Sequence, residues 1–328
     1  MKKNLNLVEA TNINFTAKER EKSILRIASL SIKEGRCVFI PGQNGAGKSS
    51  LLSVLGGYLV PDSADIFWKG QKVKPLKDRL VPGFEGIELV KQDSELNPFL
   101  SVNEQLEKAA RHLIPTEAKT LIRKTVQICH LKALLFQKTG SLSGGEKRRL
   151  AIGLALMKGC ELLLLDEPFS DLDATHKLLF MGLLLGLKKE SGISICIVSH
   201  NGEDALWLAD EVWTMEKGRF IEKLKRIDNQ FYPQRLETAM LLGWKNVFPV
   251  GLFPILNEEP KKKWIQLPPE KINENGHGVL LGKAELLNHF VSGSNYHKIW
   301  KIKDAILESI NLKLIDQKGV DSDLYFEG

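Results

Sequence analysis

Short runs of apolar residues separated by polar turns dominate the first two thirds of the chain. Residues 37–40, 162–165 and 193–199 are apolar almost throughout, which is typical of strands buried on both faces of a parallel sheet. Residues 5–15 alternate more weakly and predict a strand, and residues 24–32 predict its antiparallel return. With the helical segments between them, these runs predict an α/β fold.

Helical spacing predicts the elements that connect these strands. Residues 51–59 predict a helix that follows the buried strand 37–40, and residues 150–157 predict one that precedes the buried strand 162–165. Residues 100–135 also have helical spacing, with Thr116 as the expected N-cap of the helix that follows it. Residues 176–189 are apolar nearly all round, so we expect this helix to be buried against the sheet.

The remaining strands of this region are shorter. Hairpins are predicted at residues 65–73, with Lys69 and Gly70 as the turn, and at residues 212–221. Residues 88–92 predict one more strand, which ends in a glutamine. The pattern therefore places one continuous domain over residues 1–224.

The pattern changes after about residue 224. Residues 228–246 are partly helical, and short strand-like pieces punctuated by Pro, Gly and Asn follow, at residues 250–256, 264–267, 279–281, 297–302 and 310–315. They predict a small β-barrel or sandwich over residues 225–320. Residues 321–328 resemble a protease recognition site of the kind used to remove expression tags. We leave them out of the fold prediction, with native sequence as the alternative.

Composition narrows the class of protein. The chain of 328 residues carries 46 basic and 40 acidic residues, and its only compact basic run, residues 261–263, is better explained as a solvated loop than as a nucleic-acid patch. Four cysteines lie singly in apolar surroundings, which favours buried thiols in a reducing cytoplasm over a zinc site. No signal peptide is evident, and the longest apolar run, residues 178–187, is too short to span a bilayer. We expect a soluble chain that reaches a membrane only through a partner.

A glycine-rich loop joins the first buried strand to the helix after it. It reads G-x-x-x-x-G-K-S from Gly42 to Ser49. Glycines let backbone amides wrap phosphates, the Lys48 amine reaches phosphate oxygens, and the Ser49 hydroxyl is a ligand suited to Mg²⁺. The residues predicted to bind nucleotide are Gly42, Gln43, Asn44, Gly45, Ala46, Gly47, Lys48, Ser49 and Ser50.

Further candidate residues follow the other buried segments. Ser143 and Glu146 form a capping-box pattern, so a helix should begin there with free amides that favour phosphate. Asp166 and Glu167 follow the strand 162–165, and His200 follows the strand 193–199. Since ligands bind at the carboxyl ends of parallel strands, we expect these side chains at one edge of the sheet.

These motifs resemble those of the ATP-binding cassette (ABC) ATPases. The loop from Gly42 resembles their Walker A motif, Leu-Ser-Gly-Gly-Glu at 142–146 their signature, and Leu-Leu-Asp-Glu-Pro followed by Ser-Asp-Leu-Asp their Walker B motif and D-loop. The resemblance implies a P-loop nucleotide-binding domain with a mixed sheet and a helical subdomain at about 97–140. It also implies ATP and Mg²⁺ as cofactors.

The resemblance also implies roles for single residues. Glu167 would polarise the attacking water, and His200 would contact the γ-phosphate. Gln92 would join Ser49 and Asp166 around Mg²⁺ and report the nucleotide state. The family stacks an aromatic ring on adenine, and Phe15 is the nearest aromatic residue.

Partners follow from the same resemblance. Two copies would enclose two ATP molecules, each between the Walker A loop of one copy and Ser143, Gly144 and Gly145 of the other, with Asp173 coupling the two sites. The helical subdomain would dock on a transmembrane permease, which places the chain in the cytoplasm on the inner face of the membrane. The C-terminal domain loosely resembles the regulatory domain of oxyanion and related importers, with a small molecule as its ligand.

Three functions stay open at this point. The first is the ATPase of a transporter, and of an importer in particular. The second is a non-transport ABC ATPase that acts on ribosomes or DNA, although tandem cassettes and long coiled-coil insertions are absent from the sequence. The third is a ligand-sensing protein in which the C-terminal domain carries the main function and ATP hydrolysis is its output.

Overall fold

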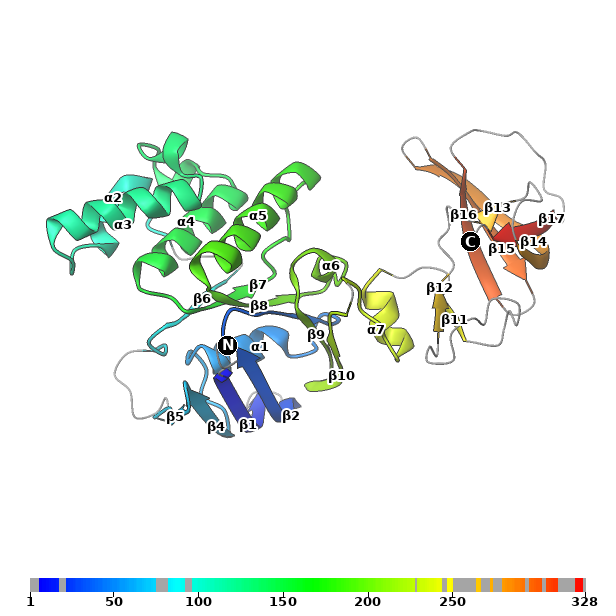
Figure 1. The fold of residues 1–328 in the computed structure, drawn as a ribbon, viewed down its shortest axis with the longest axis horizontal. Helices are drawn as coiled ribbons and strands as arrows, with labels where there is room; N and C mark the ends of the chain where they lie inside the picture. The colour runs from blue at the N-terminus through cyan, green and yellow to red at the C-terminus, as the bar shows by residue number, and fades with distance from the viewer. Residues whose placement is uncertain are drawn as a thin grey trace. The chain divides into compact units, whose positions relative to one another are not determined.

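The computed structural model describes residues 6–17, 22–74, 82–91, 96–227 and 229–243, and after residue 246 only the backbone of the strands. The chain separates into two compact units, Met1–Phe231 and Tyr232–Gly328. Figure 1 shows the elements of each unit, and the units are treated separately below.

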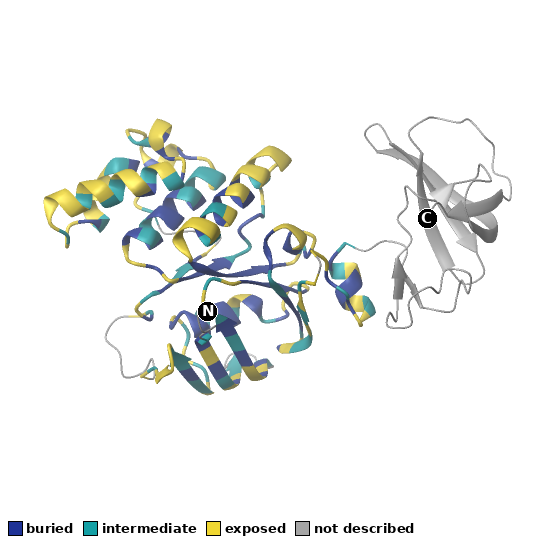
Figure 2. Ribbon diagram, viewed as in Figure 1, coloured by how far each residue is buried: buried dark blue, intermediate teal, exposed yellow. Residues whose placement is uncertain are grey.

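A six-stranded sheet forms the centre of the first unit, in the order β10-β9-β3-β8-β7-β6. The strands β3 (Cys37–Pro41), β8 (Ser194–Ser199), β7 (Leu162–Asp166) and β6 (Ile87–Val90) are parallel to their neighbours. Every residue of β3 and β8 is buried, as the dark blue strands of Figure 2 show. The strands predicted from the apolar runs are therefore confirmed, because both faces of this sheet are covered.

Two antiparallel strands extend this sheet at one edge. The strand β9 (Glu211–Glu216) is parallel to β3, and β10 (Arg219–Lys225) returns antiparallel to β9. This confirms the predicted hairpin and makes the sheet mixed.

A second, antiparallel sheet has the order β2-β1-β4-β5. It contains β1 (Asn6–Ala17), β2 (Lys22–Lys33), β4 (Ser63–Trp68) and β5 (Gln71–Lys72). The helix α1 (Lys48–Leu55) lies between the two sheets (Figure 1), and its apolar side chains belong to the same buried cluster as residues of both sheets. This shared core holds the phosphate loop at the start of α1 in place.

A helical part contains α2 (Val102–Ala109), α3 (Pro115–Ile128) and α4 (Gly144–Met157). A capping box of Ser101 and Glu104 begins α2. The predicted N-cap at Thr116 is wrong, since the N-cap is Ile114 and α3 begins at Pro115, whose fixed backbone angle suits the first helical position without a side-chain cap. Short 3₁₀ turns at Lys132–Leu134 and Thr139–Ser141 lead back towards α4.

The helix α5 (Ala174–Gly186) continues into a π-helical turn at Leu187–Ser191. It buries Phe180, Met181 and Leu184, but Leu178 and Leu179 are 61% and 59% exposed. The predicted burial of this helix therefore applies to one face only. A helix on the surface of a sheet covers it with one face only, so the leucines of the opposite face remain in solvent. A four-residue helix, α6 (Ala205–Leu208), follows β8.

The second unit begins with α7 (Leu236–Leu241) and continues as antiparallel strands. Its five-stranded sheet has the order β13-β17-β14-β15-β16, with β13 (Ile272–Asn273), β14 (Val279–Ser292), β15 (Asn295–Ile302), β16 (Ala305–Asn311) and β17 (Ser322–Phe326). The strands β11 (Val247–Pro249) and β12 (Trp264–Gln266) form a separate pair.

Two sequence predictions for this unit need comment. The piece predicted at 250–256 lies outside the described residues. The segment 321–328, left out of the fold prediction, contains β17, which pairs with β13 and β14. Within the described residues of the whole chain, no helix has the length and apolarity needed to cross a membrane.

Candidate functional site

The phosphate loop connects the end of β3 to the start of α1. Gly42 donates its backbone N–H to the Ser199 carbonyl at 3.2 Å, which ties the loop to the neighbouring strand β8. Gly47 is the N-cap of α1 and has φ 97°. A Cβ there would lie 2.8 Å from the Ile24 carbonyl oxygen, so only glycine fits this turn. The loop therefore presents the N-terminus of a buried helix, which favours phosphate.

Lys48 lies inside this loop and is only 6% exposed. Its Nζ donates to the Gly42 carbonyl at 2.8 Å and the Gln43 carbonyl at 3.3 Å. It also lies 3.6 Å from Glu167 Oε1. The Lys48 ammonium group is thus held by neutral carbonyls and one carboxylate, at the place where the loop amides converge. It can exchange these acceptors for phosphate oxygens.

Ser49 and Asp166 meet beside the loop. The Ser49 Oγ donates to Asp166 Oδ1 at 2.9 Å, so the hydroxyl of α1 and the carboxylate at the end of β7 are neighbours. Burial raises the pKa of Asp166 above its ordinary value, and the nearby Glu167 raises it further, while the Ser49 hydrogen bond lowers it. A hydroxyl and a partly buried carboxylate are the hard oxygen ligands that Mg²⁺ prefers, so this pair fits that ion.

Glu167 and His200 form the next part of the site. Glu167 Oε2 lies 2.8 Å from His200 Nδ1 and accepts the His200 backbone N–H at 3.2 Å. Glu167 has φ 47°, and its backbone N–H is bonded to the Val198 carbonyl at 3.0 Å. This turn directs the carboxylate towards both Lys48 and His200. The arrangement provides a proton acceptor beside a group that can contact phosphate.

The signature residues lie at the start of α4. Ser143 is the N-cap, and its backbone N–H and hydroxyl each donate to Glu146 Oε2 at 2.9 Å. Ser143 and Gly144 are exposed. Within the described residues, no hydrogen bond or ion pair joins this helix start to the phosphate loop of the same chain. The capping box is confirmed, but one chain does not assemble the two phosphate-directed elements.

The structure describes two of the three remaining predicted residues, Phe15 and Asp173. Phe15 pairs with Leu25 in the second sheet and packs, partly buried, against the hydrophobic core. Gln92 lies outside the described residues. Asp173 caps α5 by accepting the His176 backbone N–H at 2.9 Å. That hydrogen bond, and then the His176 ring, hold the pKa of Asp173 below its ordinary value.

Sequence reasoning missed Arg148, which is 5% exposed. Its Nη1 donates to the carbonyls of Pro168 and Ser170 at 3.1 and 2.6 Å, and its Nη2 to Ser170 Oγ at 2.9 Å. Ser170 Oγ in turn donates to the Glu167 carbonyl at 2.9 Å. Arg148 thus connects the signature helix to the loop that carries Glu167. It lies in the run Lys147-Arg148-Arg149, which resembles an exposed helix face, and no signal in the sequence distinguishes it.

Comparisons with known proteins agree with this geometry. The sequence profile of the family described as ABC transporter matches residues 25–170. The chain is 32% identical to a molybdate/tungstate import ATP-binding protein of Thermococcus kodakarensis, over 70% of this chain and 69% of that protein. It is 33% identical to a taurine import ATP-binding protein of Pseudomonas aeruginosa, over 66% of this chain and 81% of that protein.

Solved structures show the same fold. One is cbiO1 from Clostridium perfringens, part of an ABC transporter complex, with a TM-score of 0.60, 27% identity and coverage of 67% of this chain and 88% of that one. Another is the dimeric post-hydrolysis state of an ATP-binding cassette bound to ADP and Pi, with a TM-score of 0.58, 25% identity and coverage of 66% and 98%. The chain therefore belongs to the ABC transporter family, and it is an ATP-binding and ATP-hydrolysing subunit of that family.

Proposed function

We propose that this chain powers an importer for a small solute and works as a dimer that closes around two ATP molecules. One observation carries the proposal: Lys48, Glu167 and His200 converge in a single site, while among the described residues no hydrogen bond or ion pair joins the signature residues of the same chain to it. A second copy would supply the missing half. The dimeric cassette with ADP and Pi is a structural neighbour of this chain, which supports the same arrangement here.

The phosphates of ATP would be held by the loop amides and by Lys48. Lys48 would exchange its bonds to the Gly42 and Gln43 carbonyls for charged phosphate oxygens, which are stronger acceptors. Ser49, Asp166 and Gln92 would hold Mg²⁺, directly or through water. When bound, this ion would neutralise charge on the phosphates.

Glu167 would act on the water that attacks the γ-phosphate. Its carboxylate is only partly exposed and is fixed by His200. Little entropy is therefore lost in orienting it for the transition state. His200 would contact the γ-phosphate through its ring and keep the carboxylate in position. Hydrolysis would remove the phosphate that both copies grip, and the dimer could reopen.

The permease would dock on the helical part. Phe99 and Phe136 are 81% and 89% exposed. Their segments lie side by side, since Ser101 pairs with Lys138 and the Thr139 N–H donates to the Leu100 carbonyl at 2.9 Å. Two large exposed aromatic rings on neighbouring segments are typical anchors of a protein interface. A cavity of about 350 Å³ borders this helical part and could receive a partner helix; it is lined by residues that include Tyr58, Leu89, Leu96, Ala151, Leu154 and Lys158.

The solute would be small, and an oxyanion or sulfonate is favoured. The relatives named above import molybdate or tungstate and taurine, and a third relative, of Haemophilus influenzae, is an Fe(3+) ions import ATP-binding protein at 27% identity over 84% of this chain. The unit from Tyr232 onward would regulate transport or hold the dimer together. Through the permease, the chain would lie on the inner face of the membrane.

A variant of the proposed catalytic carboxylate tests the mechanism. Glu167→Gln should reduce ATP turnover by at least about 100-fold, because the amide cannot accept a proton from water. Nucleotide binding should persist, and ATP should now yield a stable dimer in size-exclusion chromatography. Glu161→Gln, at the other end of the same strand, removes only an exposed ion pair with Lys69 and should hydrolyse ATP normally. Normal turnover of Glu167→Gln would refute its assignment.

A further inference from the structure

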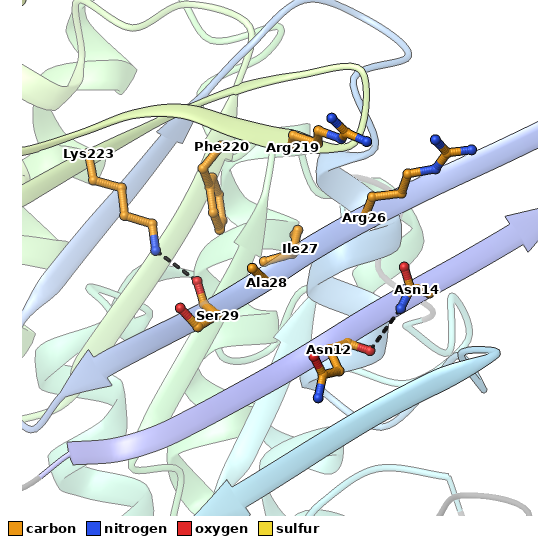
Figure 3. Close-up of a pocket in the computed structure, with 9 residues that line it drawn as sticks. All are labelled: Asn12, Asn14, Arg26, Ile27, Ala28, Ser29, Arg219, Phe220 and Lys223. Carbon is orange, nitrogen blue, oxygen red and sulfur yellow. Dashed lines mark hydrogen bonds between the residues drawn. The ribbon is translucent and has the colours of Figure 1, made fainter.

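A groove lined by cations lies on the surface of the first unit, away from the catalytic carboxylates. It has a volume of about 580 Å³ and lies between the exposed face of β1 and β2 and the strand β10. Arg26, Arg219 and Lys223 contribute three positive charges, and none of the described residues that line the groove is acidic. Figure 3 shows Arg26 and Arg219 at one end of the groove and Lys223 at the other, with Phe220 between them.

Among the described residues, no carboxylate neutralises the two arginines. Arg26 donates its Nε to Ser23 Oγ at 2.8 Å, and among the described residues neither Arg26 nor Arg219 forms an ion pair with a carboxylate. Both guanidinium groups lie at the same end of this set of lining residues, on side chains from different strands (Figure 3). Like charges held on one surface repel each other, and a bound anion would remove that repulsion.

The opposite end of the groove is more rigid. Lys223 Nζ donates to the Ser29 carbonyl at 2.9 Å and lies 4.8 Å from the ring centroids of both Trp213 and Phe220. Burial lowers the pKa of Lys223 below its ordinary value. The ammonium group of this exposed side chain is held over two rings and beside a carbonyl, a fixed place from which it can attract an anion.

The groove adjoins the phosphate loop through the backbone only. The Arg26 N–H donates to the Gly218 carbonyl at 2.9 Å, and the Gly218 N–H donates to the Ala46 carbonyl at 2.9 Å. Arg219 follows directly in the chain. The side chains that line the groove include none of those proposed to hold the phosphates of ATP.

We propose that this groove is a second anion site, which binds a tetrahedral oxyanion group through Arg26 and Arg219. Lys223 attracts the far end of any ligand that is long enough to span the groove. Guanidinium forks recognise planar pairs of oxygen atoms on phosphate-like groups and bind them in bidentate fashion. The group could belong to a free inorganic oxyanion or to a phosphate ester. The inference does not depend on the proposed import function.

Calorimetric titration of the full chain tests this site. The nucleotide site is first saturated with ADP and Mg²⁺, and the probes are molybdate, pyrophosphate and glycerol phosphate. We expect saturable binding of at least one probe, which weakens as salt is added. Arg26→Gln/Arg219→Gln should weaken it at least tenfold. The matched control is Arg123→Gln/Lys124→Gln, which removes two exposed charges from α3 and should leave binding unchanged.

The outcomes separate the sources and the alternatives. Binding of molybdate or pyrophosphate alone identifies a free oxyanion, and binding of glycerol phosphate identifies an ester. No binding to any probe, or equal loss in the control variant, would overturn the proposal. ATP turnover of Arg26→Gln/Arg219→Gln, measured in parallel, should stay normal and thereby separates this site from the catalytic one.

Discussion

The charged side chains of the proposed ATP site hold one another in position. Lys48 is bonded to the loop carbonyls, Ser49 to Asp166, and Glu167 to His200. These side chains come from three segments, which follow β3, β7 and β8 at the carboxyl edge of the sheet, so the strand register sets the separation of these segments. Binding can then use groups that are already oriented.

Removing the amine of Lys48 should weaken nucleotide binding directly. In Lys48→Ala, the charge-assisted bonds to phosphate are lost, and we expect the Kd for ATP to rise by at least about tenfold. Titration with a fluorescent ATP analogue measures this change. Lys72→Ala is the control, because Lys72 pairs only with the exposed Asp65. An unchanged Kd in Lys48→Ala would contradict the assigned role.

Asp166 should make the nucleotide-free protein sensitive to pH. The pKa of Asp166 is raised in the folded state, so ionisation of this carboxyl destabilises the fold. This destabilisation is absent below the pKa of the unfolded chain, and it grows as the pH rises through the pKa of the folded chain. Asp166→Asn keeps an acceptor for Ser49 and removes the charge. Its Tm without nucleotide should exceed that of the native chain at pH 7, and the difference should shrink as the pH falls towards 4. Calorimetry that finds a constant difference would argue against this cause.

At the scale of elements, the signature helix and the D-loop are joined by direct contacts. Arg148 joins α4 to the carbonyls of Pro168 and Ser170. A Cβ on Gly145 would lie 3.1 Å from Leu172 Cδ2, so the helix start and the D-loop are also in close contact. In a dimer, α4 would touch one ATP and the Glu167 loop the other. This connection gives the two sites a physical link within each chain.

Truncating Arg148 should therefore affect both stability and turnover. Arg148→Met leaves buried carbonyls without their donor, and we expect a loss of about 1–3 kcal/mol in the free energy of unfolding. Turnover should fall more than ATP affinity, since the Glu167 loop is loosened while the phosphate loop is intact. Denaturant unfolding and kcat measurements test this. Arg149→Met is the control, because that side chain makes only a 3.4 Å bond to the His130 carbonyl.

Element prediction succeeded where the pattern has a single physical cause. The buried strands and the capping box at Ser143 follow from apolar runs and from cap chemistry, which are local. Thr116 failed as a cap because Pro115 begins the helix just as well. The exposed face of α5 could not be predicted, because an apolar helix does not reveal how many of its faces are covered.

At the scale of the whole molecule, Phe99 and Phe136 should matter only in the assembled transporter. Both rings are almost fully exposed, so Phe99→Ser/Phe136→Ser should change the free energy of unfolding by no more than about 0.5 kcal/mol. The isolated chain should hydrolyse ATP normally. Recovery of the permease in pull-downs from solubilised membranes should drop sharply, whereas Ile114→Ser, another exposed apolar position, should recover it fully. Equal recovery by both variants would exclude this surface.

The chemistry of the protein could be read from its sequence because phosphate binding depends on local backbone. A glycine-rich loop between a strand and a helix creates its own phosphate cradle, and carboxylates that end buried strands meet at one edge. Contacts between residues far apart in the chain could not be read in this way. Arg148 bonds to the loop that carries Glu167, and Arg26 lines the same groove as Arg219. Both arrangements depend on how separate elements pack, and side-chain identity alone does not encode that packing.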